Sequence, residues 1–241
     1  MKENRDNNSI AIDFLMYSYF GITSACKSEE MIFACIKRAY LDACRTITFP
    51  NCDIFSKNDS KGYFFMTEVA RVIYKKINEI TGDYDEWHRS VCESIIAEGQ
   101  SDRMNTFYGE SIQLTYGHAQ KWVNMTMKYL YLLEILLEKG YVGCNWEKLH
   151  VPIDSYVMEA FDRESKKKSK DILEVSAWSN IESEDRYKEY QEKIREIAKG
   201  ETPVNWEGPA WISVAEVRSK EEAQKKSNRL AVLKNKRGLA E

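Results

Sequence analysis

The chain has 241 residues, a formal net charge of −3 and 43% apolar residues. This composition suits one large globular domain or two small domains packed closely together. It argues against a membrane-spanning protein, because no apolar run approaches the roughly 20 residues that a bilayer requires. The polar N-terminus also lacks the apolar core of a signal peptide. We therefore expect a cytoplasmic monomer that does not associate with membranes.

The six cysteines are scattered along the chain, and none forms a C-x-x-C pair. No set of cysteines and histidines has the spacing of a zinc or iron–sulfur site. We therefore expect free thiols in a reducing compartment, no metal and no organic cofactor.

Apolar residues recur at three- and four-residue spacing along most of the chain, which predicts an all-α fold. Ser28, followed by two glutamates, is typical of a helix start, and Gly140 is typical of a residue just beyond a helix end. We expect an irregular stretch between Pro203 and Pro209. The expected helices lie at about 10–20, 28–47, 62–80, 83–98, 105–116, 119–139, 154–162, 168–180, 183–199 and 210–232.

Two stretches are rich in positive charge, residues 163–170 (RESKKKSK) and residues 218–238. Such runs are typical of a solvated face or a tail. They can also contact phosphate groups. The sequence leaves both interpretations open.

Lys121 lies near the start of the expected helix at 119–139, which is apolar on nearly all sides and should therefore be central. A positive charge near a helix N-terminus is unfavourable. Burial and the helix end both disfavour the charged amine, so both lower its pKa. An amine with a lowered pKa can act as a nucleophile near neutral pH. The alternative is an ordinary lysine whose amine reaches the surface.

The segment "LTYGHAQK", which ends at Lys121, reads as the end of the helix at 105–116, a tight turn at Gly117 and a new helix. It resembles the hairpin of the helix-hairpin-helix DNA glycosylases, whose pattern is apolar-x-Gly-x-Gly-x-Lys. Leu114 and Gly117 match this pattern, Ala119 replaces the second glycine, and Lys121 falls on the catalytic lysine. The resemblance implies that backbone N–H groups of the hairpin hold a DNA phosphate. The residues implied in that contact are Gly117, His118, Ala119 and Gln120.

Asp154 follows an apolar-Pro-apolar segment and precedes an apolar-periodic helix, so it is a typical N-cap. In the glycosylase superfamily an aspartate at such a helix start faces the catalytic lysine. The 33 positions between Lys121 and Asp154 are similar to the spacing in the archaeal 8-oxoguanine DNA glycosylase branch. That branch also carries a second lysine seven positions after the first, and Lys128 fits this position. The resemblance implies that Lys128 reaches a phosphate, and the alternative is a surface lysine.

The sequence "NWEGPAWI" places Glu207 and Trp211 four positions apart, where they can share one helix face. In the archaeal branch an acid and a tryptophan at this spacing form part of the base pocket. The indole would stack on a flipped-out base and the carboxylate would accept hydrogen bonds from its N–H groups. Met125 would belong to the same pocket. Glu207 replaces that branch's Asp, which leaves the target base open, and the alternative is a core tryptophan beside a helix-start acid.

The resemblance implies two packed helical halves, with a helix-hairpin-helix DNA-binding element and an active-site cleft between them, in a single unit over residues 1–241. Residues 1–104 would form an N-terminal helical layer. Residues 105–215 would hold the hairpin, the catalytic residues and the base pocket, and residues 216–241 a basic helix or tail. Further phosphate contacts would come from Lys166, Lys167 and Lys168.

The implied function is that of a DNA glycosylase with AP-lyase activity, whose partner is DNA that carries a damaged or modified base. Asp154 would orient or deprotonate Lys121, and the amine would displace the base and form a Schiff base with the sugar. One alternative is a defence glycosylase that acts on hypermodified bases of viral DNA. The others are a helical module that binds DNA without chemistry and a helical interaction protein that does not touch nucleic acid.

Overall fold

The computed structural model describes residues 7–50, 62–167 and 177–236, and every regular element in these ranges is helical. The expected all-α class is confirmed. The α-helices in chain order are α1 (Asn7–Phe20), α2 (Ser28–Ala43), α3 (Tyr63–Asn78), α4 (Tyr84–Gly99), α5 (Asp102–Tyr108), α6 (Tyr116–Leu137), α7 (Ser155–Lys167), α8 (Glu184–Ala198) and α9 (Pro203–Lys236). The 3-10 turns in these ranges are η1 (Cys44–Thr46), η2 (Trp146–Lys148) and η3 (Trp178–Asn180).

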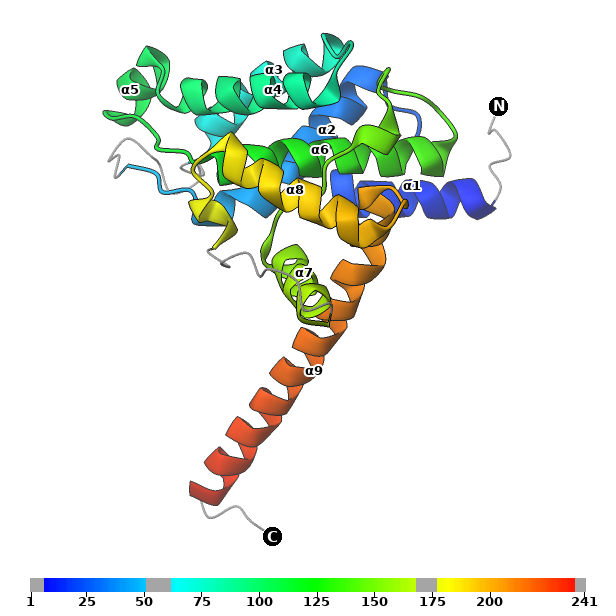
Figure 1. Cartoon of the computed structure of the whole chain (residues 1–241), viewed down its shortest axis with the longest axis vertical. Helices are drawn as coiled ribbons and strands as arrows, with labels where there is room; N and C mark the ends of the chain where they lie inside the picture. The colour runs from blue at the N-terminus through cyan, green and yellow to red at the C-terminus, as the bar shows by residue number, and fades with distance from the viewer. Residues whose placement is uncertain (1–6, 51–61, 168–176, 237–241) are drawn as a thin grey trace.

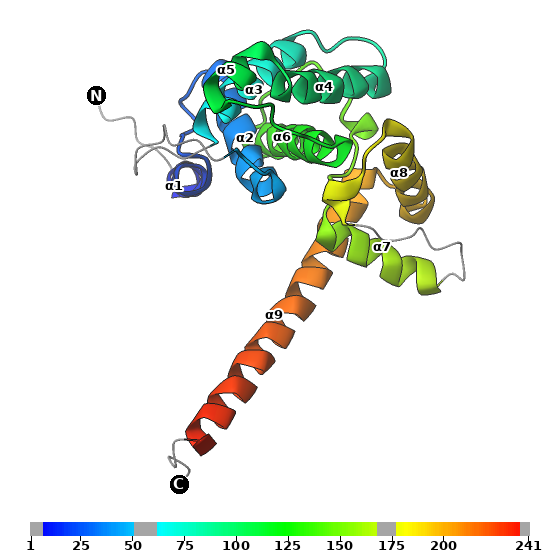
Figure 2. The same cartoon turned by 90° about the vertical axis from the view of Figure 1, so that its left-hand side faces the viewer.

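Helix α6 forms the centre of the helical body, and α2, α4 and α8 pack around it (Figures 1 and 2). Its first half is buried on nearly all sides, because apolar residues point in every direction around the helix. Trp122 is almost inaccessible and donates its indole N–H to the carbonyl oxygen of Ile36 on α2 at 2.9 Å. Lys121 therefore lies in the buried first half of the central helix.

The start of α6 differs from the expected hairpin. The expected helix at 105–116 ends early, since Gly109 adopts a left-handed φ of 80°. Helix α6 begins directly after Thr115, whose side chain accepts a hydrogen bond from the backbone N–H of His118 at 3.3 Å. Gly117 therefore lies inside the first turn of α6, and the expected tight turn at this glycine is wrong.

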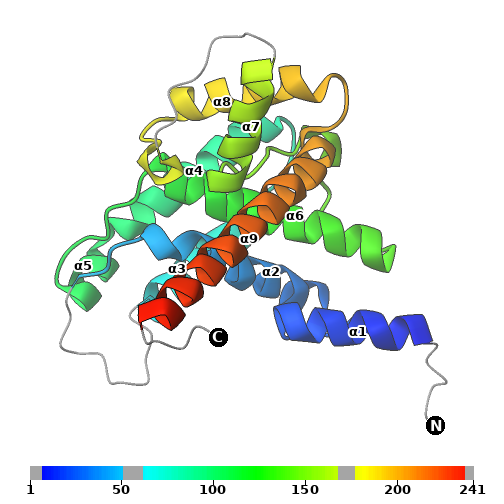
Figure 3. The ribbon, with the colours of Figure 1, turned by 90° about the horizontal axis from the view of Figure 1, so that it is seen from below.

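Helix α9 is longer than the expected helix at 210–232. It begins at Pro203, because a first helical residue does not need its N–H. It continues through Pro209, an interior proline that removes one intrahelical hydrogen bond, so the expected irregular stretch between the two prolines is wrong. Residues 219–233 are exposed on all sides and project from the body (Figures 1 and 2), and from below α9 crosses in front of the other helices (Figure 3).

The other expected helices correspond to α1, α2, α3, α4, α7 and α8, and α7 extends to Lys167. The expected helix at 168–180 lies mostly outside the described residues, and its described end forms η3. None of the described helices is long and apolar enough to cross a membrane.

Replacement of Trp122 by Ala tests the central role of α6. Removal of a fully buried indole leaves a cavity and loses its hydrogen bond to α2, so the free energy of unfolding should fall by about 3–5 kcal/mol. Urea denaturation followed by circular dichroism measures this change. Leu230→Ala is the control, because Leu230 on the projecting part of α9 is 61% exposed and its loss should change stability by no more than about 0.5 kcal/mol. Equal losses for the two variants would contradict this description of the core.

Candidate active site on helix α6

Lys121 and Asp154 converge, although 33 positions separate them in the chain. The Nζ atom of Lys121 lies 3.9 Å from Oδ2 of Asp154, and their side chains are 10% and 14% exposed. The amine also lies 4.3 Å from the ring centre of Trp178 in η3. This is a cation–π distance. The expected meeting of the amine and the carboxylate is therefore present in the structure.

The burial of Lys121 changes its chemistry. Loss of hydration disfavours the ammonium form and lowers the pKa of Lys121 below its ordinary value, while the nearby Asp154 raises it again in part. Burial is the larger of the two effects. The side chain therefore loses its proton more readily than a surface lysine, and the neutral amine is the nucleophilic form.

Asp154 has two roles at once. Its Oδ1 atom accepts hydrogen bonds from the backbone N–H groups of Tyr156 and Val157, both at 2.9 Å, and so caps the N-terminus of α7. Its Oδ2 atom is the oxygen that faces Lys121. Because the cap fixes one oxygen, the other is held in one direction, toward the amine.

Lys128 and Glu207 form a second buried ion pair two turns further along α6. Lys128 Nζ lies 2.6 Å from a carboxylate oxygen of Glu207 on α9, and Glu207 is almost inaccessible. Burial raises the pKa of Glu207, Lys128 lowers it, and the charge of Asp154 raises it again. The two ion pairs are therefore electrostatically connected. The partner of Lys128 in this structure is a carboxylate, and its expected phosphate contact stays a prediction.

The remaining residues of the expected base pocket lie beside these pairs. Met125 is half-buried on α6 and falls between Lys121 and Lys128 on the same helix face. Trp211 follows Glu207 by one turn of α9 and stacks on Tyr156 of α7, with 4.6 Å between ring centres. One face of the indole is therefore occupied by a protein ring in this structure.

The first turn of α6 does not present free donors to a phosphate. The N–H of Gly117 donates to the carbonyl oxygen of Ile181 at 2.8 Å, and the N–H groups of His118 and Ala119 donate to Thr115, each at 3.3 Å. The side chain of Gln120 is fully buried and bonds to the backbone. A hairpin anion site at these four residues is therefore not formed in this conformation, because the chain itself satisfies the donors.

His118 belongs to the same cap. Its Nδ1 atom accepts a hydrogen bond from the backbone N–H of Thr115 at 3.1 Å, and its ring packs edge-on against Trp178. Burial lowers the pKa of His118. The ring is therefore neutral near pH 7 and adds no positive charge to attract a phosphate.

The lysines that were expected to contact phosphate follow one another at the C-terminal end of α7. Lys166 and Lys167 fall in its last turn, and Lys168 lies outside the described residues. Within the same stretch Arg163 is paired with Glu159. Arg218 of α9 also pairs with Glu159, at 2.6 Å, so one cation of the C-terminal basic segment fastens α9 to α7.

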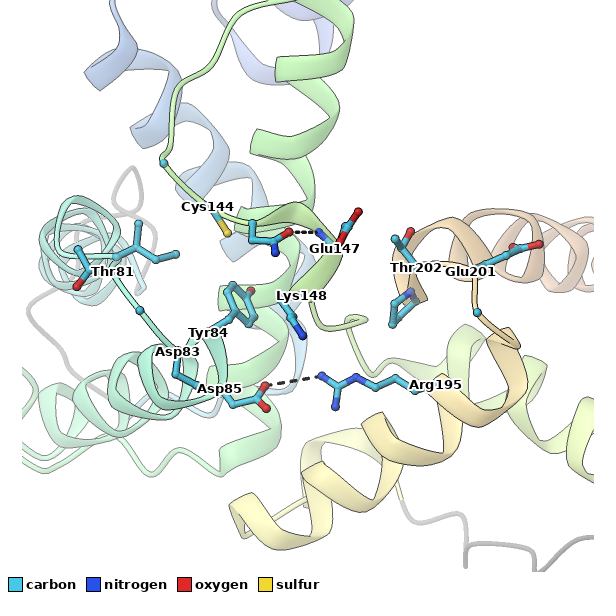
Figure 4. Close-up of a pocket in the computed structure, with 16 residues that line it drawn as sticks. Thr81, Asp83, Tyr84, Asp85, Cys144, Glu147, Lys148, Arg195, Glu201 and Thr202 are labelled. Carbon is cyan, nitrogen blue, oxygen red and sulfur yellow. Dashed lines mark hydrogen bonds and ion pairs between the residues drawn. The ribbon is translucent and has the colours of Figure 1, made fainter.

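A cavity of about 780 Å³ lies elsewhere, between the α3–α4 turn, the segment around η2 and the α8–α9 turn (Figure 4). Neither Lys121 nor Asp154 lines it, so it is not the cleft expected beside them. Asp85 faces Arg195 across it at 3.7 Å, and buried His150 bonds to Asp85 at 2.5 Å. The hydrogen bond from His150 is the main reason that the pKa of Asp85 falls to about 2. Among the described residues no group of His, Cys, Asp and Glu side chains is placed to hold a metal ion.

The comparisons with protein-family models, curated proteins and solved structures find no match for this chain.

Gly117→Ala tests the covering of the α6 N-terminus by η3. A Cβ atom at this position would lie 2.1 Å from the backbone carbonyl oxygen of Trp178, so η3 must move away. We expect the free energy of unfolding to fall by about 1–3 kcal/mol, as for an overpacked core, and the fluorescence of Trp178 to change. Gly140→Ala is the matched control, because a Cβ atom there meets nothing within 4 Å. An unchanged stability of Gly117→Ala would contradict the close approach.

Proposed function

We propose that this protein is a DNA glycosylase with AP-lyase activity that excises a damaged or modified base through a Schiff base on Lys121. The observation that carries the proposal is the buried amine of Lys121, with its pKa lowered by burial, 3.9 Å from the capping carboxylate of Asp154. A buried lysine beside one acid is a costly arrangement for stability alone. It is a useful arrangement for a nucleophile and its base.

The chemistry follows from the two side chains. Asp154 accepts a proton from Lys121, and the neutral amine attacks C1′ of the nucleotide. The bond between C1′ and the base breaks, and the base leaves with the bonding electrons and takes up a proton. Opening of the sugar ring at the C1′–O4′ bond, with proton transfer from the nitrogen, gives the Schiff base. Removal of a C2′ proton then expels the 3′ phosphate by β-elimination.

The surrounding groups support the same assignment. One oxygen of Asp154 is free of the helix cap. After the proton taken from Lys121 has passed to the leaving base, the regenerated carboxylate can stabilise the positive charge that develops on the sugar. Glu207, Met125 and Trp211 lie on the elements that flank the ion pairs, and we assign them to the pocket for the flipped-out base. Trp211 would have to exchange its contact with Tyr156 for a contact with the base, or stack the base on its other face.

Borohydride trapping tests the Schiff base. The protein is incubated with labelled duplexes that contain 8-oxoguanine, an abasic site, or modified cytosines that include glucosylated cytosine, and then reduced. We expect a covalent adduct on at least one duplex, and its loss in Lys121→Gln with DNA affinity largely retained. Lys75→Gln on α3 is the control, because Lys75 is an exposed lysine whose side chain is 78% accessible. An adduct that survives Lys121→Gln would remove Lys121 from the mechanism, and the absence of adduct and base release on every duplex would contradict the proposed activity.

Asp154→Asn separates the chemical role of this residue from its structural one. Asn is as good an N-cap as Asp, so α7 should keep its cap, and any loss of stability should come only from the lost charge partner of Lys121. Loss of the proton acceptor should slow base release by about 10²–10⁴-fold in single-turnover kinetics. Asp83→Asn is the matched control, since Asp83 caps α4 in the same way and lies outside the site. A rate for Asp154→Asn that equals the wild-type rate would reduce Asp154 to a cap.

A further inference from the structure

Two glutamines hold the extended segment that leads into Asp154. Gln120 of α6 bonds to both backbone groups of Ile153: its Nε2 donates to the carbonyl oxygen at 3.0 Å and its Oε1 accepts from the N–H at 3.2 Å. Gln191 of α8 bonds to both backbone groups of Val151 in the same way, at 2.7 and 3.0 Å. Each amide thus replaces the strand partner that an extended segment would have in a sheet.

We propose that Gln120 is the positioning residue that sets the distance between Lys121 and Asp154. The proposal rests on the proposed function, in which these two groups act together. Gln120 precedes Lys121 in the chain, and Ile153 precedes Asp154. The pair of hydrogen bonds between Gln120 and Ile153 therefore joins the two reacting residues through their immediate neighbours.

The amide of Gln120 is itself held in place. Asn124, one turn further along α6, donates to Oε1 of Gln120 at 3.1 Å and to the hydroxyl of Tyr187 at 2.8 Å. Tyr187 is hydrogen-bonded in turn to His150 at 2.8 Å. All four side chains are buried. A buried amide with several partners has one favourable orientation, since any other leaves polar groups unpaired.

The two glutamines differ in what they can affect. Gln191 holds Val151 from α8, three residues before Asp154 and on a helix that does not carry Lys121. Gln120 holds the residue next to Asp154 from the helix that does carry Lys121. Loss of either pair of hydrogen bonds leaves buried backbone groups without a partner, although the carbonyl oxygen of Val151 keeps a bond from Asn124 of α6 at 3.2 Å, so both losses should destabilise the fold. Only loss of the two hydrogen bonds between Gln120 and Ile153, here called the Gln120 clamp, should let Asp154 move relative to the amine of Lys121.

Gln120→Met and Gln191→Met test this difference in the full-length protein without DNA. The pKa of Lys121 is measured by NMR of ¹³C-methylated lysines, with Lys121→Arg to assign the signal. Asp154 raises the pKa of Lys121, so we expect Gln120→Met to lower it in the same direction as Asp154→Asn, and Gln191→Met to leave it at the wild-type value. Both variants should lower the midpoint of thermal unfolding. Equal pKa values in Gln120→Met, Gln191→Met and wild type would overturn the proposal.

A second pair of variants covers the case in which Gln120→Met does not fold. Gln120→Asn and Gln191→Asn keep the amide and shorten its reach by one methylene, so they break the same bonds without leaving an apolar group among polar ones. The same pKa comparison applies, with the same outcomes for and against. Because it is made on free protein, it is independent of any DNA substrate.

The kinetic measurement connects the clamp to the reaction. On the duplex that gives the strongest adduct, Gln120→Asn should lower kcat by on the order of 10²-fold with little change in KM, as for a reacting group that is misplaced by about 1 Å. Gln191→Asn should lower kcat far less at a temperature where both variants are folded. If the pKa of Lys121 is lowered in Gln120→Asn but the wild-type protein gives no adduct, the role of Gln120 is supported and the glycosylase proposal is contradicted. A normal pKa and normal kcat in Gln120→Asn would contradict the clamp and leave the glycosylase proposal standing.

Discussion

The structure depends on one constraint: the first half of α6 is buried on all sides and yet carries Gln120, Lys121 and Asn124. An apolar helix could satisfy such a position with packing alone. Each polar side chain here needs a partner that does not come from α6, because an unpaired polar group in the interior costs about 1–3 kcal/mol. The partners come from the segment before α7, from α8 and from η3. The polar residues of the central helix thus determine how the later part of the chain is arranged around it.

The two buried ion pairs fit this constraint differently. An ion pair of this kind contributes little net stability, since the loss of hydration offsets most of the attraction. The Lys128–Glu207 pair is close, and it fastens the start of α9 to the central helix. The Lys121–Asp154 pair is longer than a hydrogen bond, so its amine is partnered by charge and by the Trp178 ring but is not fully saturated.

Much of the fold followed from apolar periodicity, because that pattern depends on helix geometry alone. The errors came from residues whose local meaning is ambiguous. Gly117 reads as a turn residue, but here a glycine is required because the carbonyl oxygen of Trp178 lies against its Cα. Pro203 and Pro209 read as helix breakers, although the first is favourable at a helix start. For Gly117 the deciding contact involves a segment far away in the chain.

Only part of the candidate site could be predicted, because a sequence pattern shows local relationships and not contacts between distant segments. The spacing of Lys121 and Lys128 on one helix face is local, and so is the cap at Asp154. The contact between Lys128 and Glu207 spans 79 positions, and no local pattern contains it. Gln191 and His150 gave no usable signal, because a glutamine in an amphipathic helix and a single histidine two positions before a proline are common in any sequence. Their roles depend on the backbone groups and hydroxyls that the fold brings to them.

The projecting part of α9 has a mechanical consequence for the site. An α-helix is stiff along its axis, and residues 219–233 extend about 22 Å at 1.5 Å per residue beyond the body. The projecting helix is a lever, and a force applied at its far end is transmitted to the start of α9, where Glu207 and Trp211 lie. Pro209 lies between these two residues, and its missing N–H makes this a point where the helix can bend. Trp211 stacks on Tyr156, and Arg218 ties α9 to the same helix α7. Bending at Pro209 would therefore move α7 together with the indole, relative to Glu207, which stays fixed to α6.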